Sequence, residues 1–63
     1  MITTAIQKTS QSVWVYNESG SARQYTGHLV DYTSNTVIIR PLSALHSVNV
    51  YDDKGRHLQT IPC

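Results

Sequence analysis

The sequence predicts an all-β domain in which five short antiparallel strands close into a strongly bent barrel, preceded by a short N-terminal helix. Apolar and polar residues alternate with a period of two in several short runs, as in strands that bury one face. Clusters of turn-forming residues separate these runs at spacings of about 8 to 12 residues, which is typical of small barrels. The 63 residues suffice for one domain, and the five strands are expected within residues 12–61.

The N-terminal segment, residues 1–11, has a helical spacing of its apolar residues. Ile2 and Ile6 lie four residues apart and would share one face of a helix that Thr3 or Thr4 could cap. A helix this short is marginally stable in water, so it would form only if both isoleucines packed on the sheet. An added edge strand is the alternative interpretation of this segment.

The first predicted hairpin begins at Ser12. Residues 12–16 alternate two valines with two aromatic residues, which indicates a strand with one buried face. The run Asn17–Ala22 is rich in turn formers and should reverse the chain. Arg23–Tyr32 is then the return strand, and Gly27 marks the bend in it because a glycine lets the backbone turn sharply.

A short turn at Thr33–Asn35 is expected to close the second hairpin. Asn35 tolerates the left-handed backbone conformation that such turns need. Thr36–Arg40 is the third strand, and Pro41 ends it because proline has no amide hydrogen for the ladder. Leu42–His46 is expected to form a single helical turn or an irregular connection.

The last predicted hairpin joins Ser47–Asp52 to Arg56–Ile61. Asp52–Gly55 has the pattern of a type I turn followed by a left-handed glycine. A flat five-stranded meander would leave two exposed edges and much apolar surface in water, which favours a barrel. The alternation places these residues inside it: Val13, Val15, Leu29, Val37, Ile39, Val48, Val50 and Leu58.

Composition limits the partners only weakly. Five Lys and Arg against four Asp and Glu give a net charge of +1, so nucleic-acid binding would need a local patch. The chain has neither a charged leader with an apolar core nor a run near the roughly 20 apolar residues of a membrane span, and we expect a soluble cytoplasmic protein. A chain this short builds a small core, so a homo-oligomer is expected. Cys63 is the only cysteine and is expected to be a free terminal thiol.

Two motifs make the chain resemble the Sm-like proteins, the family of Sm, LSm and Hfq-type rings. The first is V-x-V, a glycine five positions later, a bending G-x-L, and an aromatic and an Asn before an aliphatic run: Val13-Trp14-Val15, Gly20, Gly27-His28-Leu29, Tyr32, Asn35 and Val37–Ile39. The second is a basic residue and a glycine followed by two spaced aliphatics: Lys54, Gly55, Leu58 and Ile61. The broader class of SH3-like barrels accounts for the same strands and remains open.

The resemblance implies a ring of subunits that binds single-stranded RNA around its pore. Adjacent subunits would join edge to edge, the fourth strand of one pairing with the fifth of the next. Asn35 would hydrogen-bond a base and Lys54 would contact a base or phosphate. Arg56 would add to this site if the four cations Arg23, Arg40, Lys54 and Arg56 cluster in the fold.

A protein-interaction module is the alternative function, as in the small adaptors of phages and mobile elements. Trp14, Tyr16 and Tyr51 fall on the faces opposite the valines of their strands, where they could form a docking surface or pack under another segment. No cofactor is indicated. The three histidines and Cys63 have no paired ligand spacing, so no metal site is expected. No catalytic constellation is present and the chain can hardly build a cleft, so we expect no enzyme.

Overall fold

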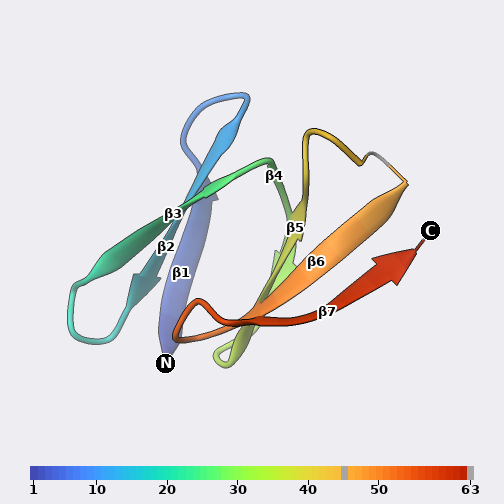
Figure 1. Ribbon diagram of the computed structural model, residues 1–63. Coiled ribbons are helices and arrows are strands. Elements are labelled where there is room, and N and C mark those ends of the chain that lie inside the picture. Colours follow the sequence, from blue (N-terminus) through green and yellow to red (C-terminus); the bar gives the residue numbers. More distant parts are fainter. Residues whose placement is uncertain (45, 63) are drawn as a thin grey trace.

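The computed structural model describes residues 1–44 and 46–62, which form seven strands in two antiparallel sheets (Figure 1). The three-stranded sheet consists, in order, of β1 (Ile2–Gln7), β2 (Ser12–Asn17) and β3 (Ala22–Thr26). The four-stranded sheet consists of β4 (His28–Tyr32), β5 (Thr36–Arg40), β6 (Ser47–Asp52) and β7 (His57–Pro62). These described residues contain no helix. The all-β character is confirmed, whereas the five-stranded closed barrel with an N-terminal helix is wrong.

The first error concerns the N-terminal segment, where β1 takes the place of the expected helix. It pairs antiparallel with β2 along its length, so the added edge strand is the interpretation that holds. A register shift between Ile2 and Thr4 allows Ile2 and Ala5, three residues apart, to enter the core together. Ile6 remains 40% exposed. The strand is more stable than the helix because pairing with β2 satisfies the backbone hydrogen-bonding groups of this segment, while a helix this short has little stability of its own.

The second error concerns the strand count, because Gly27 divides the single return strand into β3 and β4. Its φ angle is +138°, a region that side chains disfavour. A β-carbon at this position would also collide with the carbonyl oxygen of Arg40 and the side chain of Ile39. The predicted bend is therefore confirmed, and it is sharp enough to send the two halves into different sheets.

Within the described residues, hydrogen bonds join the two sheets on one side. On this closed side, β1 lies beside β4, and the Gln7 carboxamide donates to the Gly27 carbonyl and accepts from the Leu29 amide. The Ile2 amide also donates to the Ser34 carbonyl, over 2.7 Å. On the opposite, open side, β3 and β7 are the end strands of their sheets and do not pair with each other in the described chain (Figure 1). The barrel therefore stays open between β3 and β7.

The core lies between the sheets and is made by β1, β2 and β5. Its buried residues are Ile2, Ala5, Val13, Val15, Val37 and Ile39, with Tyr25, Leu29 and Tyr51 packed against them. Val48 and Val50 are buried as expected, 8% and 6% exposed, although they lie outside this cluster, whereas the expectation that Leu58 is buried is wrong. Val37 pairs with Tyr51 and Ile39 with Asn49, so the two valines point to the opposite, outer face of the sheet.

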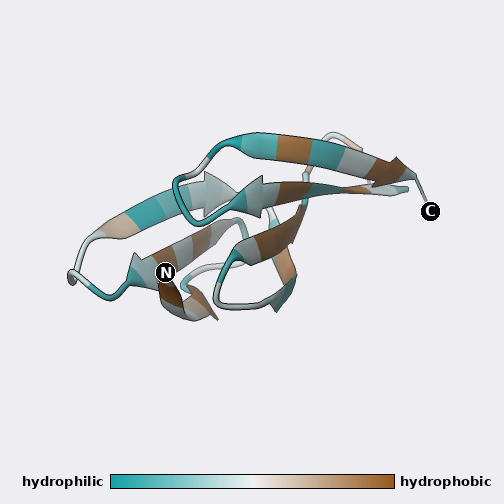
Figure 2. Cartoon of the chain, turned by 90° about the horizontal axis from the view of Figure 1, so that it is seen from below, coloured by the Kyte–Doolittle hydropathy of each residue, from teal (hydrophilic) through white to brown (hydrophobic). Residues whose placement is uncertain are grey.

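Leu58 is 54% exposed because a bulge displaces it from the ladder. Gln59 pairs with Val50 and His57 with Tyr51, which leaves Leu58 without an opposite residue. In Figure 2, the strand that ends at the C label, β7, carries hydrophobic residues between hydrophilic ones. All six residues of β7 are exposed. An alternating pattern in the sequence therefore does not guarantee that a strand has a buried face.

The connection between β5 and β6 begins at Pro41, as expected. The Ala44 amide donates to the Pro41 carbonyl over 3.4 Å, which closes a turn at Leu42 and Ser43. Leu45 and Cys63 lie outside the described residues, and so do part of the expected helical turn at 42–46 and the expected free thiol. Within residues 1–44 and 46–62, no helix has the length and apolar character needed to cross a membrane.

Candidate functional site

The open side exposes a row of aromatic rings that comes from both sheets. Tyr25 of β3 and Tyr51 of β6 have ring centroids 4.9 Å apart, and Tyr51 and His57 of β7 are separated by 5.6 Å. The two tyrosines are half-buried and the histidine is exposed. The row thus leads from the aliphatic core outward to solvent. Burial at its inner end raises the pKa of the Tyr25 hydroxyl above its ordinary value.

Arg23 lies beside this row, next to the turn between β6 and β7. A β-carbon on Gly55 would lie 2.9 Å from the Arg23 Cδ and Nε atoms, so the guanidinium packs where Gly55 has no side chain. Gly55 has a φ of +84°, as the turn pattern predicts. A shallow cleft of about 380 Å³ is lined by Ala22, Arg23, Gln24, Tyr25 and Gly55, none of them acidic. We call Arg23, Tyr25, Tyr51, Gly55 and His57 the seam surface.

A short hydrogen-bond chain fixes the histidine of the seam surface. The Thr60 hydroxyl donates to Asn49 Oδ1 over 2.8 Å, and His57 Nε2 lies 2.9 Å from the same hydroxyl oxygen. Because the single hydroxyl proton is already donated, His57 Nε2 must carry a hydrogen and donate. Asn49 Nδ2 in turn donates to the Tyr51 hydroxyl over 3.4 Å. The ring of His57 is thereby held beside Tyr51.

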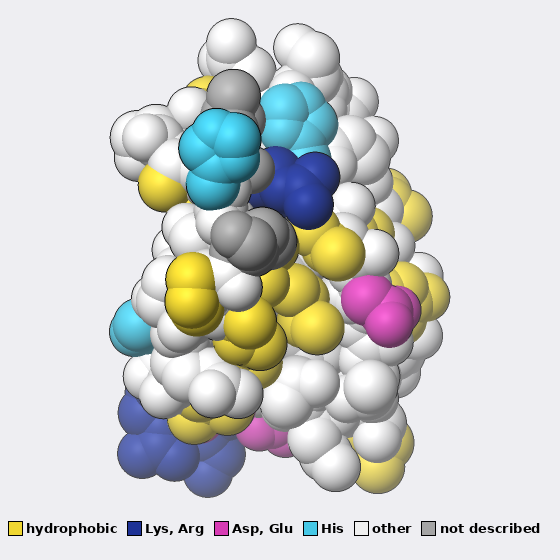
Figure 3. Space-filling model, turned by 90° about the vertical axis from the view of Figure 1, so that its right-hand side faces the viewer, with side chains coloured by type: hydrophobic (Ala, Val, Ile, Leu, Met, Phe, Trp, Pro, Cys, Tyr) yellow, Lys and Arg dark blue, Asp and Glu magenta, His cyan; other side chains and the backbone are white. Residues whose placement is uncertain are grey.

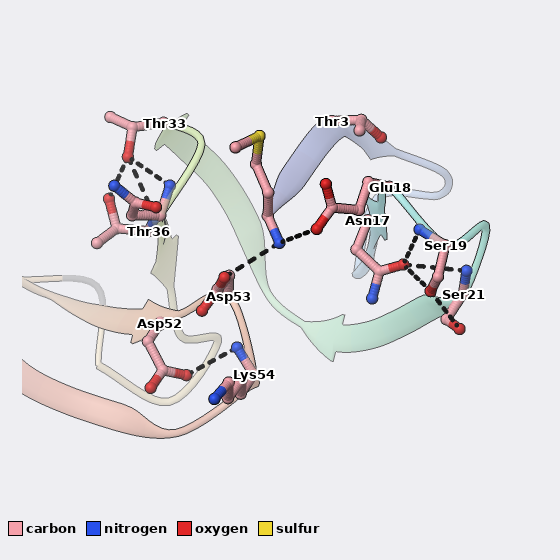
Figure 4. Close-up of polar contacts among 12 residues, drawn as sticks. Thr3, Asn17, Glu18, Ser19, Ser21, Thr33, Thr36, Asp52, Asp53 and Lys54 are labelled. Atoms are coloured by element: carbon pink, nitrogen blue, oxygen red, sulfur yellow. Dashed lines mark hydrogen bonds and ion pairs between the residues drawn. The ribbon is translucent and has the colours of Figure 1, made fainter.

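Asp52 organises the turn that borders the seam surface (Figure 4). Its Oδ1 accepts from the backbone amides of Lys54 at 2.9 Å and Arg56 at 2.8 Å, and its Oδ2 accepts from Arg56 Nε at 3.0 Å. The amide and guanidinium of Arg56 and the amide of Lys54 lower the pKa of the Asp52 carboxyl. Much of the Arg56 charge is therefore offset by Asp52.

The sequence-predicted residues Asn35 and Lys54 lie at one end of the four-stranded sheet. Thr36 pairs with Asp52, so the β4–β5 and β6–β7 turns are neighbours at this end. Thr33 Oγ1 accepts from the amides of Asn35 and Thr36 and closes the first turn. No non-glycine residue of the described chain has a positive φ, so the expected left-handed Asn35 is wrong. The hydrogen bonds to the Thr33 hydroxyl close this turn without a positive φ angle at Asn35.

Negative charge also gathers at this end. The N-terminal ammonium of Met1 lies 3.1 Å from Asp53 Oδ2 and 3.6 Å from Glu18 Oε1, as drawn in Figure 4. Of the four cations considered together, Arg23, Lys54 and Arg56 lie around the β6–β7 turn. Arg40 does not, because it pairs with His28 on the outer face of the four-stranded sheet. The cations are thus only partly clustered, and acidic groups lie among them.

The three aromatic residues predicted as a docking surface are separated by the fold. Trp14 and Tyr16 pair with Ile6 and Thr4 on the outer face of the three-stranded sheet, while Tyr51 is on the inner face of the other sheet. Tyr25 and His57 were not predicted as site residues, and Arg23 was named only as one of four cations that could cluster. The alternation of residues 23, 25 and 27 in the sequence places Arg23 and Tyr25 on one face of their strand. It does not show that this strand lies beside β6 and β7 in the fold. No group of three or more possible metal ligands occurs in residues 1–44 and 46–62.

Comparisons with known proteins identify no relative. The chain matches no family model, no curated protein and no solved structure at a significant level.

Proposed function

We propose that this chain is a non-catalytic binding module that holds single-stranded nucleic acid on the seam surface. The row of Tyr25, Tyr51 and His57 on the open side, beside the guanidinium of Arg23, is the observation that carries the proposal. Base stacking on aromatic rings contributes roughly 1 to 3 kcal/mol per base and tolerates any sequence. A cation beside the rings supplies the phosphate contact that such sites combine with stacking.

Electrostatics make this binding weak and sensitive to salt. Arg23 and Lys54 form no ion pair within the described chain, while Arg56 is paired with Asp52. Two phosphate contacts at about 0.7 each give a slope of about −1.4 for log K against log salt concentration. Asn35 and Lys54, the residues that the Sm-like resemblance implies, lie near enough to the β6–β7 turn to extend the same site.

Fluorescence anisotropy with labelled oligo(U) and oligo(A), at about 50 and 200 mM salt, tests the proposal. Tyr25→Leu and Arg23→Gln should each weaken binding, Tyr25→Leu by about tenfold because it removes a stacking ring. Tyr16→Leu and Lys8→Gln are matched controls, since Tyr16 lies on the outer face of β2 and Lys8 in the β1–β2 connection. The proposal fails if the wild type binds neither oligonucleotide at low salt, or if both seam variants bind as the wild type does. Unchanged binding by Asn35→Ala and Lys54→Ala would remove only those two residues from the site.

A protein-docking role is the second candidate, and it rests on the outer face of the three-stranded sheet. Ile6 and Trp14 are paired neighbours there, Ile6 exposed and Trp14 half-buried, and Tyr16 follows on the same face. Trp14 is the only tryptophan and reports on this face. Its emission should not change when an oligonucleotide occupies the seam surface. A change in tryptophan emission on oligonucleotide binding would move the nucleic-acid site to β2.

A further inference from the structure

The four-stranded sheet has an apolar outer face in addition to its core face. Ile38 pairs with Val50, and Val48 pairs with Ile61, so these side chains share the face opposite the core cluster. Of the four, Val48 and Val50 are already buried, 8% and 6% exposed, while Ile38 is half-buried and Ile61 is exposed. We call these four residues the outer apolar face. Antiparallel sheets commonly cover one face and leave the other polar, whereas strands covered on both faces have near-continuous apolar runs. The run Val37-Ile38-Ile39 in β5 is of the second kind.

Exposed apolar residues enlarge this face. Val30 at the bulge of β4 is 47% exposed, Leu42 after β5 is 39% exposed and Ile61 is 40% exposed. Figure 3 looks at the side of the molecule where β7 ends and shows hydrophobic side chains gathered in its middle, with charged groups and histidines toward its margins. Contiguous apolar surface with a polar rim marks an interaction surface on a soluble protein.

One cation and one anion accompany the outer apolar face. Arg40 pairs with His28, and Asp31 pairs with Ile38, so Arg40 and Asp31 share this face on neighbouring strands. Neither forms an ion pair within the described residues. Arg40 Nε is buried and has no hydrogen-bond partner there. The Arg40 side chain as a whole is only half-buried and its charge has no carboxylate partner among the described residues, so a partner surface that supplies a carboxylate would balance that charge.

We propose that the outer apolar face binds a second copy of this chain across a two-fold axis, sheet against sheet, with Arg40 of each copy meeting Asp31 of the other. A two-fold interface must be self-complementary, so that residue i contacts j and j contacts i. A face with one positive and one negative group around an apolar centre meets this condition. It also covers Val30, Leu42 and Ile61, which the single chain leaves exposed.

This assembly differs from a ring joined at strand edges. β6 pairs with β5 over Asn49–Asp52 and with β7 over Ser47–Tyr51, so most of this strand has no free edge in the described chain. The edge of β7 is interrupted by the bulge at Leu58 and ends at Pro62, two features that hinder pairing with another chain. Face-to-face packing uses neither edge and leaves the seam surface open.

Sedimentation or light scattering of the full chain, from about 10 to 500 µM, tests the proposal. The wild type should approach twice the 7.1 kDa of a single chain. Arg40→Glu and Asp31→Arg should each weaken self-association by at least tenfold, because each places like charges opposite one another twice. An equimolar mixture of the two variants should associate again, since both contacts are then complementary. Arg23→Glu, on the inner face of β3, is the matched charge control and should associate as the wild type does.

The other possible masses and the remaining variants also test the two-fold dimer. A wild type of 7.1 kDa at the highest concentration overturns the proposal and leaves the outer apolar face to another partner. A mass of five to eight subunits would also overturn it and would favour the ring. If Arg40→Glu fails to fold, the exposed Asp31→Arg and Val30→Lys still apply. Ile6→Lys, on the outer face of the other sheet, is the apolar control and should associate as the wild type does. If Asp31→Arg and Val30→Lys also associate as the wild type does, the proposal is wrong.

Discussion

The closed and open sides of this molecule show two ways in which a pair of small sheets can meet. On the closed side, β1 lies against β4, and main-chain and carboxamide groups of the two sheets bond to each other. On the open side, no strand joins β3 to β7 in the described chain, and aromatic rings and Arg23 occupy the boundary. Backbone bonding fixes the fold on one side, while side chains that can also contact a ligand line the other.

The difference follows from which strand takes the position beside β2. In a five-stranded closed barrel the C-terminal strand would return to this position. Here β1 occupies it and pairs with β2 from Ile2 to Gln7. β7 is therefore left at the end of the other sheet with all six residues exposed. The added N-terminal strand closes one side and, by the same pairing, leaves the other side open.

Breaking the closed side at Gly27 should have the largest effect on stability. Gly27→Ala places a β-carbon against the Arg40 carbonyl at a φ that side chains disfavour, and we expect a loss of about 3 kcal/mol in the free energy of unfolding. Gly20→Ala is the matched control, because Gly20 also has a positive φ, +85°, but nothing lies within 4 Å of its would-be β-carbon. That control should lose only about 1 kcal/mol. Urea denaturation measures both, and equal losses would show that close packing at the bend contributes nothing.

The carboxamide of Gln7 should have the next largest effect. Its Nε2 donates to the Gly27 carbonyl at 3.0 Å and its Oε1 accepts from the Leu29 amide at 2.7 Å, so one side chain takes the place of a strand-to-strand bond. Gln7→Ala leaves both backbone groups without this partner and should cost about 1 to 3 kcal/mol. Gln24→Ala, at an exposed position on the open side, should change stability by less than about 0.5 kcal/mol. A similar loss in the two variants would mean that the closed side is not the more strongly bonded one.

Local patterns in the sequence predicted the turns, and they predicted the strands that are bounded by strong turn-forming or strand-ending residues. Thr36–Arg40 and Ser47–Asp52 have the predicted bounds, and Gly27 and Gly55 have the predicted roles. Each of these depends on neighbouring residues only. The pairing partner of the N-terminal segment does not, because Ile2, Thr3 and Thr4 fit a helix start and an edge strand equally well until β2 is available.

The faces of β6 and the seam surface depend on long-range register, which the sequence does not specify. Val48 and Val50 alternate correctly with Asn49 and Tyr51, yet both faces of this strand are largely covered, so the pattern alone could not say which face meets the core. Likewise, Tyr25 and Tyr51 come together only because two different sheets face one another. Residues 26 positions apart in the chain could not be paired from alternation.

On the open side, the charge of Asp52 should give the smallest effect, and the effect should depend on pH. The bonds from the amides of Arg56 and Lys54 and from the Arg56 guanidinium hold the Asp52 pKa below its ordinary value of 3.8. A carboxyl with a lowered pKa in the folded state contributes stability above about pH 3.8, and this contribution is lost as the pH falls through the folded-state pKa. Asp52→Asn keeps an oxygen acceptor for the two amides but removes the charge. Unfolding followed from pH 7 to pH 2 should therefore show a smaller difference between wild type and variant at the acid end than at neutral pH. A difference that stays constant over this range would mean that the charge of Asp52 does not stabilise the turn that presents Gly55 and His57 to the open side.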